Sequence, residues 1–111
     1  MAAVGDLTHD HRSDVLTAKD LDGSGGCGWW RVLQTDGVTV RVLYQHYQCD
    51  GGLGIRDGRL EIDESVIRKG CDTHGCEGIF RRIRSSWDGR GFRVVSDQVL
   101  RGYWGDFAPQ L

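Results

Sequence analysis

The chain is poor in proline, in long apolar runs and in excess charge of either sign. Among its 111 residues there is one proline, and 14 basic against 16 acidic residues leave a net charge of −2. So small a charge gives no reason to expect a nucleic acid or an anionic membrane as partner. No apolar run approaches the ~20 residues that a membrane-spanning helix needs. We therefore expect a protein without a membrane span and without a nucleic-acid partner.

Helical periodicity is also scarce. No stretch longer than about ten residues keeps an apolar stripe at helical spacing, which argues against an α-helical fold. Glycine is abundant instead, with 17 residues, and this density indicates many tight turns. Asp-Gly pairs at Asp36–Gly37, Asp57–Gly58 and Asp88–Gly89 each separate alternating apolar runs. Because Asp-Gly suits tight hairpins, the pattern predicts antiparallel strands.

The alternating runs define the expected strands. Val38, Val40, Val42 and Tyr44 alternate with polar residues and should share one face of a strand. The run that begins at Ser96 fits either one turn of helix or a last strand. We expect strands at about 14–19, 29–34, 38–47, 52–56, 59–68, 79–86 and 91–97. Since short connections make sequence neighbours spatial neighbours, residues 1–111 should form one all-β domain. It would be an antiparallel meander of six or seven short strands, shaped as a small sandwich, a barrel or a propeller-blade-like domain.

The stretch GDLTHDHRSD, near the start of the chain, places oxygen-bearing side chains at alternate positions. Asp6, Thr8 and Asp10 alternate, and Asp14 follows where the first expected strand begins. A hard divalent cation takes six to eight oxygen ligands at roughly 2.3–2.6 Å. Oxygen ligands would come from those three side chains, from the backbone carbonyl of Arg12 and from the carboxylate of Asp14. The spacing predicts a cation-binding loop over residues 6–14.

Other interpretations of this stretch stay open. It is not an EF-hand, which has Gly at the sixth position and Glu at the twelfth, where this chain has His11 and Thr17. It also fits a solvated polar turn that binds no metal. A third alternative is that His9 and His11 recruit zinc or nickel, because imidazole suits those ions.

The residues GDLTHDHRSDVLTAKD resemble the calcium loop and following strand of FG-GAP or integrin-α-like repeats. That signature is D-x-D/N/T-x-D-G-x-x-D before an apolar strand, and the match is most similar to single-copy versions in exported bacterial proteins. The resemblance covers about sixteen residues and implies Ca²⁺ at the ligand set given above. The chain departs from the family at His11, where the family has a glycine with positive φ. This conformation costs most residues about 1 kcal/mol or more, although His tolerates it better than most.

Four cysteines, Cys27, Cys49, Cys71 and Cys76, occur in a small chain rich in turns. An even number in this setting predicts two disulfides and an exported protein, with three possible connectivities. A hairpin turning at residues 36–37 would place Cys27 across from roughly His46, a few residues from Cys49. The stretch CDTHGC would close on itself. We therefore favour Cys27–Cys49 and Cys71–Cys76, with a four-thiolate zinc site and free thiols as alternatives.

Aromatic and basic residues raise the question of a binding surface. Adjacent Trp29 and Trp30 must point to opposite faces of a strand, so one should be core and the other exposed. With Trp87, they form the candidate surface for a protein or glycan ligand. The basic run FRRIRSSWDGRGFR could bind a polyanion. We favour instead a strand whose arginines pair with carboxylates on a neighbour, namely Glu61, Asp63 and Glu64.

Together these patterns favour a small exported β-domain, monomeric, stabilised by Ca²⁺ and acting as a binding or structural module. It would lie in the periplasm or outside the cell, its signal peptide not being part of this chain. The alternative is an inhibitor or immunity-type protein that blocks an extracellular enzyme. An enzyme that uses the cation directly is a third hypothesis. Serines, histidines and carboxylates are present, but no spacing among them predicts a catalytic nucleophile with its general base. We therefore expect a protein that is not an enzyme.

Overall fold

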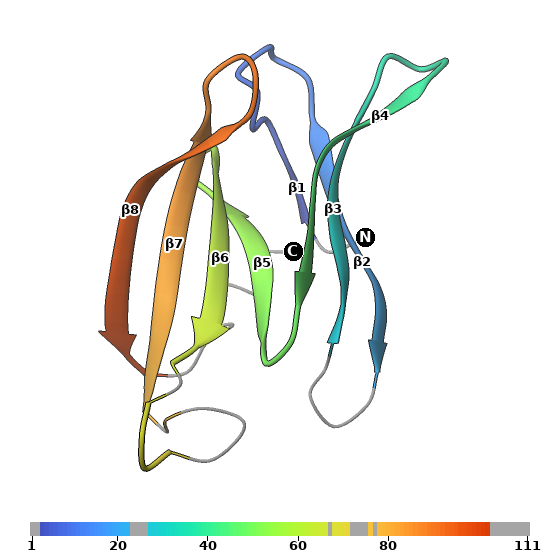
Figure 1. The fold of residues 1–111 in the computed structure, drawn as a ribbon. Helices are drawn as coiled ribbons and strands as arrows, with labels where there is room; N and C mark the ends of the chain where they lie inside the picture. The colour runs from blue at the N-terminus through green and yellow to red at the C-terminus, as the bar shows by residue number, and fades with distance from the viewer. Residues whose placement is uncertain (1–2, 23–26, 67, 72–75, 77, 103–111) are drawn as a thin grey trace.

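The computed structural model describes residues 3–22, 27–66, 68–71, 76 and 78–102, with the backbone alone at 19–22. Within these ranges the fold is all-β, with eight strands and no helix. The strands are β1 (Ala3–Gly5), β2 (Asp14–Asp22), β3 (Cys27–Thr35), β4 (Val40–Gln48), β5 (Gly51–Arg56), β6 (Arg59–Ser65), β7 (Ile79–Trp87) and β8 (Phe92–Arg101). They form two antiparallel sheets in strict sequence order, β1-β2-β3-β4 and β5-β6-β7-β8 (Figure 1).

The expected all-β antiparallel meander is confirmed, and it takes the sandwich form with eight strands. Each of the seven expected strands has a counterpart, although β6 ends at Ser65, where the expected strand ran to 68, and β8 continues to Arg101. The run from Ser96 is therefore strand and not helix. β1 was not expected, because three residues are too few to show an alternation. In the described part of the chain no helix is long and apolar enough to cross a membrane.

All three Asp-Gly pairs lie in hairpin turns. At the β5–β6 turn Asp57 has φ 52° and Gly58 has φ 72°, the pattern of a two-residue turn with positive φ at both positions. Arg56 pairs directly with Arg59 across it. The two other turns are held by their aspartates, which accept backbone hydrogen bonds.

In the β3–β4 turn the Asp36 carboxylate accepts hydrogen bonds from the backbone N–H groups of Thr39 and Val38, each at 2.8 Å. These bonds hold the pKa of Asp36 below its ordinary value. In the β7–β8 turn Asp88 accepts from the N–H groups of Arg90 and Gly91, and its pKa is lowered for the same reason. Each turn is thus ordered by a charged acceptor at its first residue.

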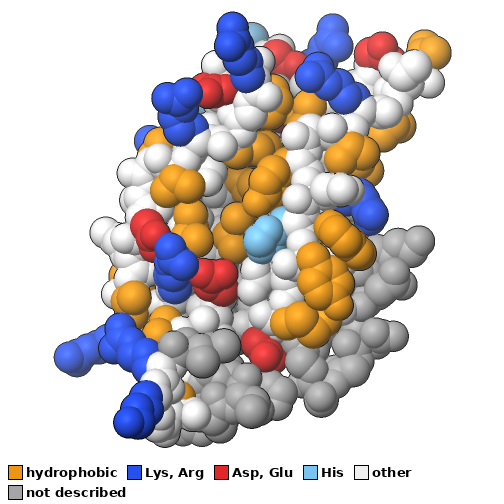
Figure 2. All heavy atoms as spheres, in the orientation of Figure 1, with side chains coloured by type: hydrophobic (Ala, Val, Ile, Leu, Met, Phe, Trp, Pro, Cys, Tyr) orange, Lys and Arg blue, Asp and Glu red, His pale blue; other side chains and the backbone are white. Residues whose placement is uncertain are grey.

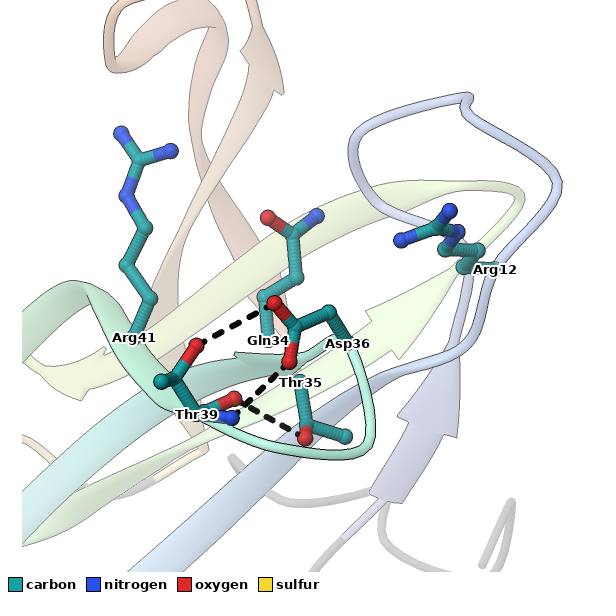
Figure 3. Close-up of a pocket in the computed structure, with 6 residues that line it drawn as sticks. All are labelled: Arg12, Gln34, Thr35, Asp36, Thr39 and Arg41. Atoms are coloured by element: carbon teal, nitrogen blue, oxygen red, sulfur yellow. Dashed lines mark hydrogen bonds between the residues drawn. The ribbon is translucent and has the colours of Figure 1, made fainter.

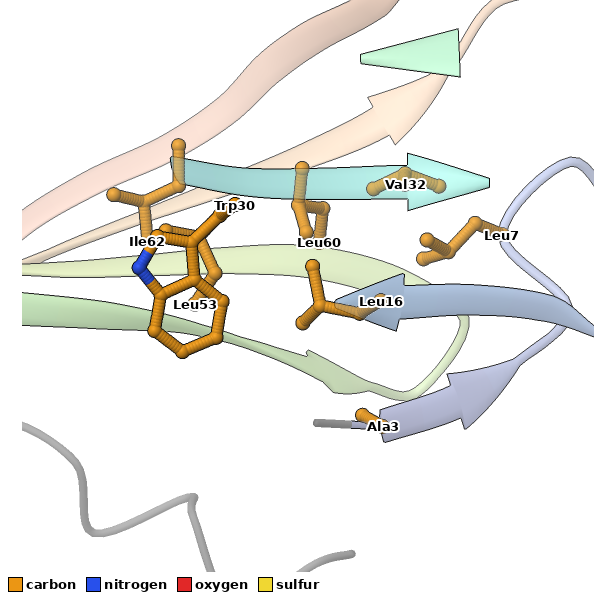
Figure 4. Close-up of a cluster of buried hydrophobic side chains, with 8 residues drawn as sticks. All are labelled: Ala3, Leu7, Leu16, Trp30, Val32, Leu53, Leu60 and Ile62. Carbon is orange, nitrogen blue, oxygen red and sulfur yellow. The ribbon is translucent and has the colours of Figure 1, made fainter. Parts of the chain in front are cut away.

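The hydrophobic core lies between the two sheets (Figure 4). Leu16, Trp30 and Val32 from the first sheet pack in one cluster with Leu60 and other residues of the second. The full set of buried core residues is Ala3, Leu7, Leu16, Trp30, Val32, Leu53, Leu60 and Ile62. Leu7 belongs to the N-terminal loop, so the core anchors one end of that loop.

A β-bulge divides β4 into two parts. Val32 pairs with Tyr44, but the next residue, Leu33, pairs with Val42, so β4 carries one extra residue. Tyr44 turns inward, against the core and the Phe92 ring at 5.6 Å. Val42 is half exposed on the other side. The expectation that the β4 valines and Tyr44 share one face was therefore wrong, because the bulge changes the alternation between them.

Both favoured disulfides are present. Cys27–Cys49 joins the start of β3 to the residue after β4, with Cα atoms 4.1 Å apart. Cys71–Cys76 closes the connection between β6 and β7. Disulfides of this kind are typical of exported proteins, and among the described cysteines none is free.

Candidate functional site

The N-terminal loop is built around a buried carboxylate. Asp14, the first residue of β2, is fully buried. Its Oδ2 accepts hydrogen bonds from the backbone N–H groups of Leu7 (2.9 Å) and Thr8 (3.1 Å) and from the Thr8 hydroxyl (3.3 Å). Since a buried carboxylate is costly unless it is hydrogen-bonded, these contacts fix the loop against the start of the strand.

A side chain from β3 completes the loop. The Gln34 amide nitrogen, Nε2, lies 3.2 Å from Thr8 Oγ1, 3.2 Å from Asp10 Oδ2 and 3.3 Å from Asp14 Oδ1. Three oxygens from three of the expected ligand residues thus converge on one point. In this structure an amide N–H₂ group occupies that point.

Asp6 faces the backbone of the loop. Its two carboxylate oxygens accept hydrogen bonds from the N–H groups of Asp10 (3.2 Å) and His11 (2.9 Å). Burial acts to raise the Asp6 pKa, but the hydrogen bonds from His11, Asp10 and His9 outweigh it, and the pKa is lowered. His11 has φ 65°, the positive φ that the corresponding glycine of FG-GAP loops would adopt. His9 also has a positive φ, of 59°.

Arg12 connects the loop with a polar cavity. Its backbone N–H donates to Asp10 Oδ1 at 2.9 Å, and its side chain reaches the wall of a cavity of about 260 Å³. The cavity is lined by Arg12, Gln34, Thr35, Asp36, Thr39 and Arg41 (Figure 3). It is smaller than the ~300–1,000 Å³ of ordinary small-molecule sites and lacks their apolar walls. It leaves open space beside the Gln34 side chain.

The loop's donor set fits a hard cation in part. Two carboxylates and one hydroxyl converge on the Gln34 amide nitrogen, so a cation could take that point only after the Gln34 side chain has moved away from it. Water would have to supply the remainder of the six to eight oxygens that Ca²⁺ takes. Among the described residues no three His, Cys, Asp or Glu side chains are grouped closely enough to hold a metal. The third acidic residue, Asp6, is engaged with the loop backbone instead.

The three tryptophans of the candidate surface lie in three different places. Trp30 is 8% exposed and packed in the core, so it cannot contribute to a surface. Trp29 is 39% exposed and meets the Tyr47 ring edge-to-face, with centroids 5.3 Å apart. Trp87 belongs to the other sheet and packs edge-to-face on Phe92 at 5.2 Å. The expectation that one member of the adjacent pair is core and the other exposed is confirmed, but the three rings do not form one surface.

The arginine-rich strand β7 is paired with carboxylates, as favoured. Arg82 makes a bidentate ion pair with buried Asp63, at 2.8 and 2.9 Å. Arg84 Nε lies 3.0 Å from Glu61 Oε1. On the other face of the sheet, Arg81 bridges the carboxylates of Glu64 and Asp97; the hydrogen bond from Arg81 is the largest cause of the lowered pKa of Asp97. These arginines therefore form ion pairs with carboxylates of their own sheet, which disfavours a polyanion-binding site on β7.

The outer face of the first sheet forms a surface that was not expected from the sequence. Trp29, Arg31 and Leu33 of β3 point away from the core, since they alternate with buried Gly28, Trp30 and Val32. Val4, Val40, Val42 and Tyr47 are also exposed. Alternation in the β3 sequence could have indicated this face, but the position of the β4 bulge could not.

Comparisons with protein-family models, with curated proteins and with solved structures find no match to this chain. Its resemblance to the FG-GAP loop thus depends on the loop residues themselves, and its function must be argued from the geometry above.

Proposed function

We propose that this chain is a small exported binding module whose N-terminal loop is stabilised by Ca²⁺. The observation that carries the proposal is the convergence of three oxygens, from Thr8, Asp10 and Asp14, within 3.3 Å of the Gln34 amide nitrogen. Once that nitrogen moves away, the same oxygens need to close by about 1 Å or less to reach the roughly 2.3–2.6 Å of Ca²⁺ ligands. Two carboxylates in the set favour a divalent ion with oxygen ligands.

The proposal assigns different roles to the five residues of the motif. Thr8, Asp10 and Asp14 hold the cation through side-chain oxygens. Asp6 orders the loop by accepting the backbone N–H groups of Asp10 and His11. Arg12 retains its expected role as a carbonyl ligand. When bound, Ca²⁺ supplies positive charge that offsets the repulsion between the two converging carboxylates, and it stabilises the folded state by mass action.

Thermal unfolding in EDTA and in millimolar Ca²⁺ tests this. The wild-type Tm should rise with Ca²⁺, and the rise should disappear in Asp10→Asn, which removes one converging carboxylate but keeps an oxygen for the Arg12 N–H. Asp57→Asn is the matched control, because it removes the same charge from a turn in which Asn-Gly is equally suited. A wild-type Tm that is identical in both buffers, or a rise retained in Asp10→Asn, would sink the proposal.

A second candidate, an inhibitor or immunity-type protein, is favoured by the exposed apolar side chains on the outer face of the first sheet. Large exposed apolar patches on small proteins mark interaction sites. Affinity capture from an envelope extract should then recover one enzyme in stoichiometric amount, and its activity should fall on addition of the purified chain. If the captured enzyme keeps its activity when the purified chain is added, the inhibitor hypothesis is excluded and the binding-module proposal stands.

A further inference from the structure

We infer that the outer face of the β1–β4 sheet, with the free edge of β4, binds an extended protein segment that carries apolar and acidic side chains. The inference deepens the binding part of the proposed function and does not depend on Ca²⁺. It rests on three features: an apolar row across the sheet, an exposed strand edge and a cation that has no ion pair among the described residues.

The apolar row follows from the registers. Val4 pairs with Val15, Val15 with Leu33, and Leu33 with Val42. Residues paired across antiparallel strands have their side chains on the same face, so the four apolar side chains run across all four strands. Val4 and Val42 are half exposed. A continuous row of this kind on the solvent side of a sheet is not needed for the core.

The exposed edge is that of β4, which pairs with β3 and with no other described strand. The bulge turns Val40 and Val42 outward, where they are 66% and 50% exposed. The hairpin that carries them projects beyond the sandwich (Figure 1), and hydrophobic side chains gather on that side of the molecule (Figure 2). An apolar edge strand offers backbone N–H and C=O groups to an added strand.

The cation is Arg31, on the same face as the row. Its guanidinium lies over the Trp29 ring, 5.7 Å from the centroid, and it has no ion pair with a carboxylate among the described residues. The described side chains of this face include no Asp or Glu. A partner that brings a carboxylate would therefore complement the face.

Two other occupants fit less well. A second copy stacked on this face would bring another Arg31 and no carboxylate. A glycan gains little from the Trp29–Tyr47 pair, since the rings meet at 62° and form no flat platform. A glycan also lacks the peptide groups that would extend the β4 ladder. A protein segment satisfies the edge, the apolar row and the cation together.

Two fluorescent peptides of about ten residues, the length of a long strand, provide the test. Both alternate Val and Thr, and two Thr positions are replaced by Glu in one peptide and by Lys in the other. Fluorescence polarisation in Ca²⁺ and in EDTA should show the Glu peptide binding at least about tenfold more tightly. Arg31→Glu should reverse that preference, and Val42→Glu should weaken the Glu peptide. Val99→Glu, an exposed valine of β8, should change nothing.

Several results would overturn the inference. They are equal binding of the two peptides, a preference unchanged by Arg31→Glu, and no binding of either peptide at about 1 mM. Sedimentation that shows a dimer, dissociated by Val42→Glu, would assign the face to a second copy instead. A peptide result that is the same in Ca²⁺ and EDTA keeps this inference even where the Tm does not respond to Ca²⁺, so the two failures are distinguishable.

Discussion

The substitution Gln34→Glu probes the point where the loop oxygens meet. In the wild type the amide nitrogen donates to Thr8, Asp10 and Asp14. Glutamate has the same shape but removes the donors and places a third carboxylate within about 3.3 Å of two others. Without a cation this arrangement should be destabilising, and with Ca²⁺ the new carboxylate becomes a strong ligand.

The magnitude follows from two contributions. Hydrogen bonds to charged groups contribute about 1.5–3 kcal/mol, and each like-charged neighbour at this distance repels by about 5 kcal/mol at an effective dielectric constant near 20. Because Gln34 is only partly buried, the side chain can turn toward solvent and relieve much of the repulsion. We expect a net loss of about 3 kcal/mol in EDTA, which lowers Tm by roughly 12 °C for a domain of this size.

Ca²⁺ should reverse most of this loss. At a free concentration of about 100 times Kd, binding to the folded state alone adds about 2.7 kcal/mol. Urea unfolding followed by tryptophan fluorescence, in EDTA and in Ca²⁺, measures both effects. Gln98→Glu, on the exposed side of β8, is the control and should stay within about 0.5 kcal/mol of the wild type. If the Gln34→Glu protein is as stable as the control in EDTA, or if Ca²⁺ does not restore its stability, the loop oxygens do not form the proposed cation site.

Three further predictions concern the scaffold. Arg82→Met leaves the buried Asp63 carboxylate without its bidentate partner and should cost about 3–5 kcal/mol in urea unfolding, whereas Arg93→Met, at an exposed pair, should cost at most about 1 kcal/mol. Replacing the cysteines by serine should cost about 3 kcal/mol for Cys27–Cys49 and about 2 kcal/mol for Cys71–Cys76, since the first closes the longer loop; equal losses would contradict the loop-length argument. The pKa values of Asp36 and Asp88, in the β3–β4 and β7–β8 turns, are lowered in the folded protein. Their contribution to folding stability should therefore be fully present above the unfolded-state pKa of about 3.9 and should be lost as the pH falls through the lower folded-state pKa values. NMR titration of the two carboxylates measures those folded-state values.

The fold was predictable where local chemistry decides it. Asp-Gly pairs set all three predicted hairpins, and alternation located seven of the eight strands. The β3–β4 register was not predictable. A two-residue turn would pair Thr35 with Val38, but the structure pairs Thr35 with Val40, and the bulge adds one more residue. Together, the longer turn and the bulge place Gly28 opposite Gln48. Their chain neighbours, Cys27 and Cys49, are the two residues that form the disulfide.

The loop was predictable as a group of oxygens but not as a finished site. The alternating motif identified Thr8, Asp10 and Asp14, which do converge. Gln34 carries no sequence signal, because it lies 20 residues from Asp14 and is brought beside it by the β2–β3 register, in which Leu33 pairs with Val15. Long-range contacts of this kind depend on strand register, and register depends on turns and bulges that composition does not specify.

A high-resolution structure from crystals grown with Ca²⁺ will show whether the loop oxygens bind a metal ion. We expect a metal peak about 2.3–2.6 Å from oxygens of Thr8, Asp10 and Asp14, with the Gln34 side chain moved so that its amide leaves that point. A map in which Gln34 Nε2 still donates to all three oxygens, with no metal between them, would contradict it.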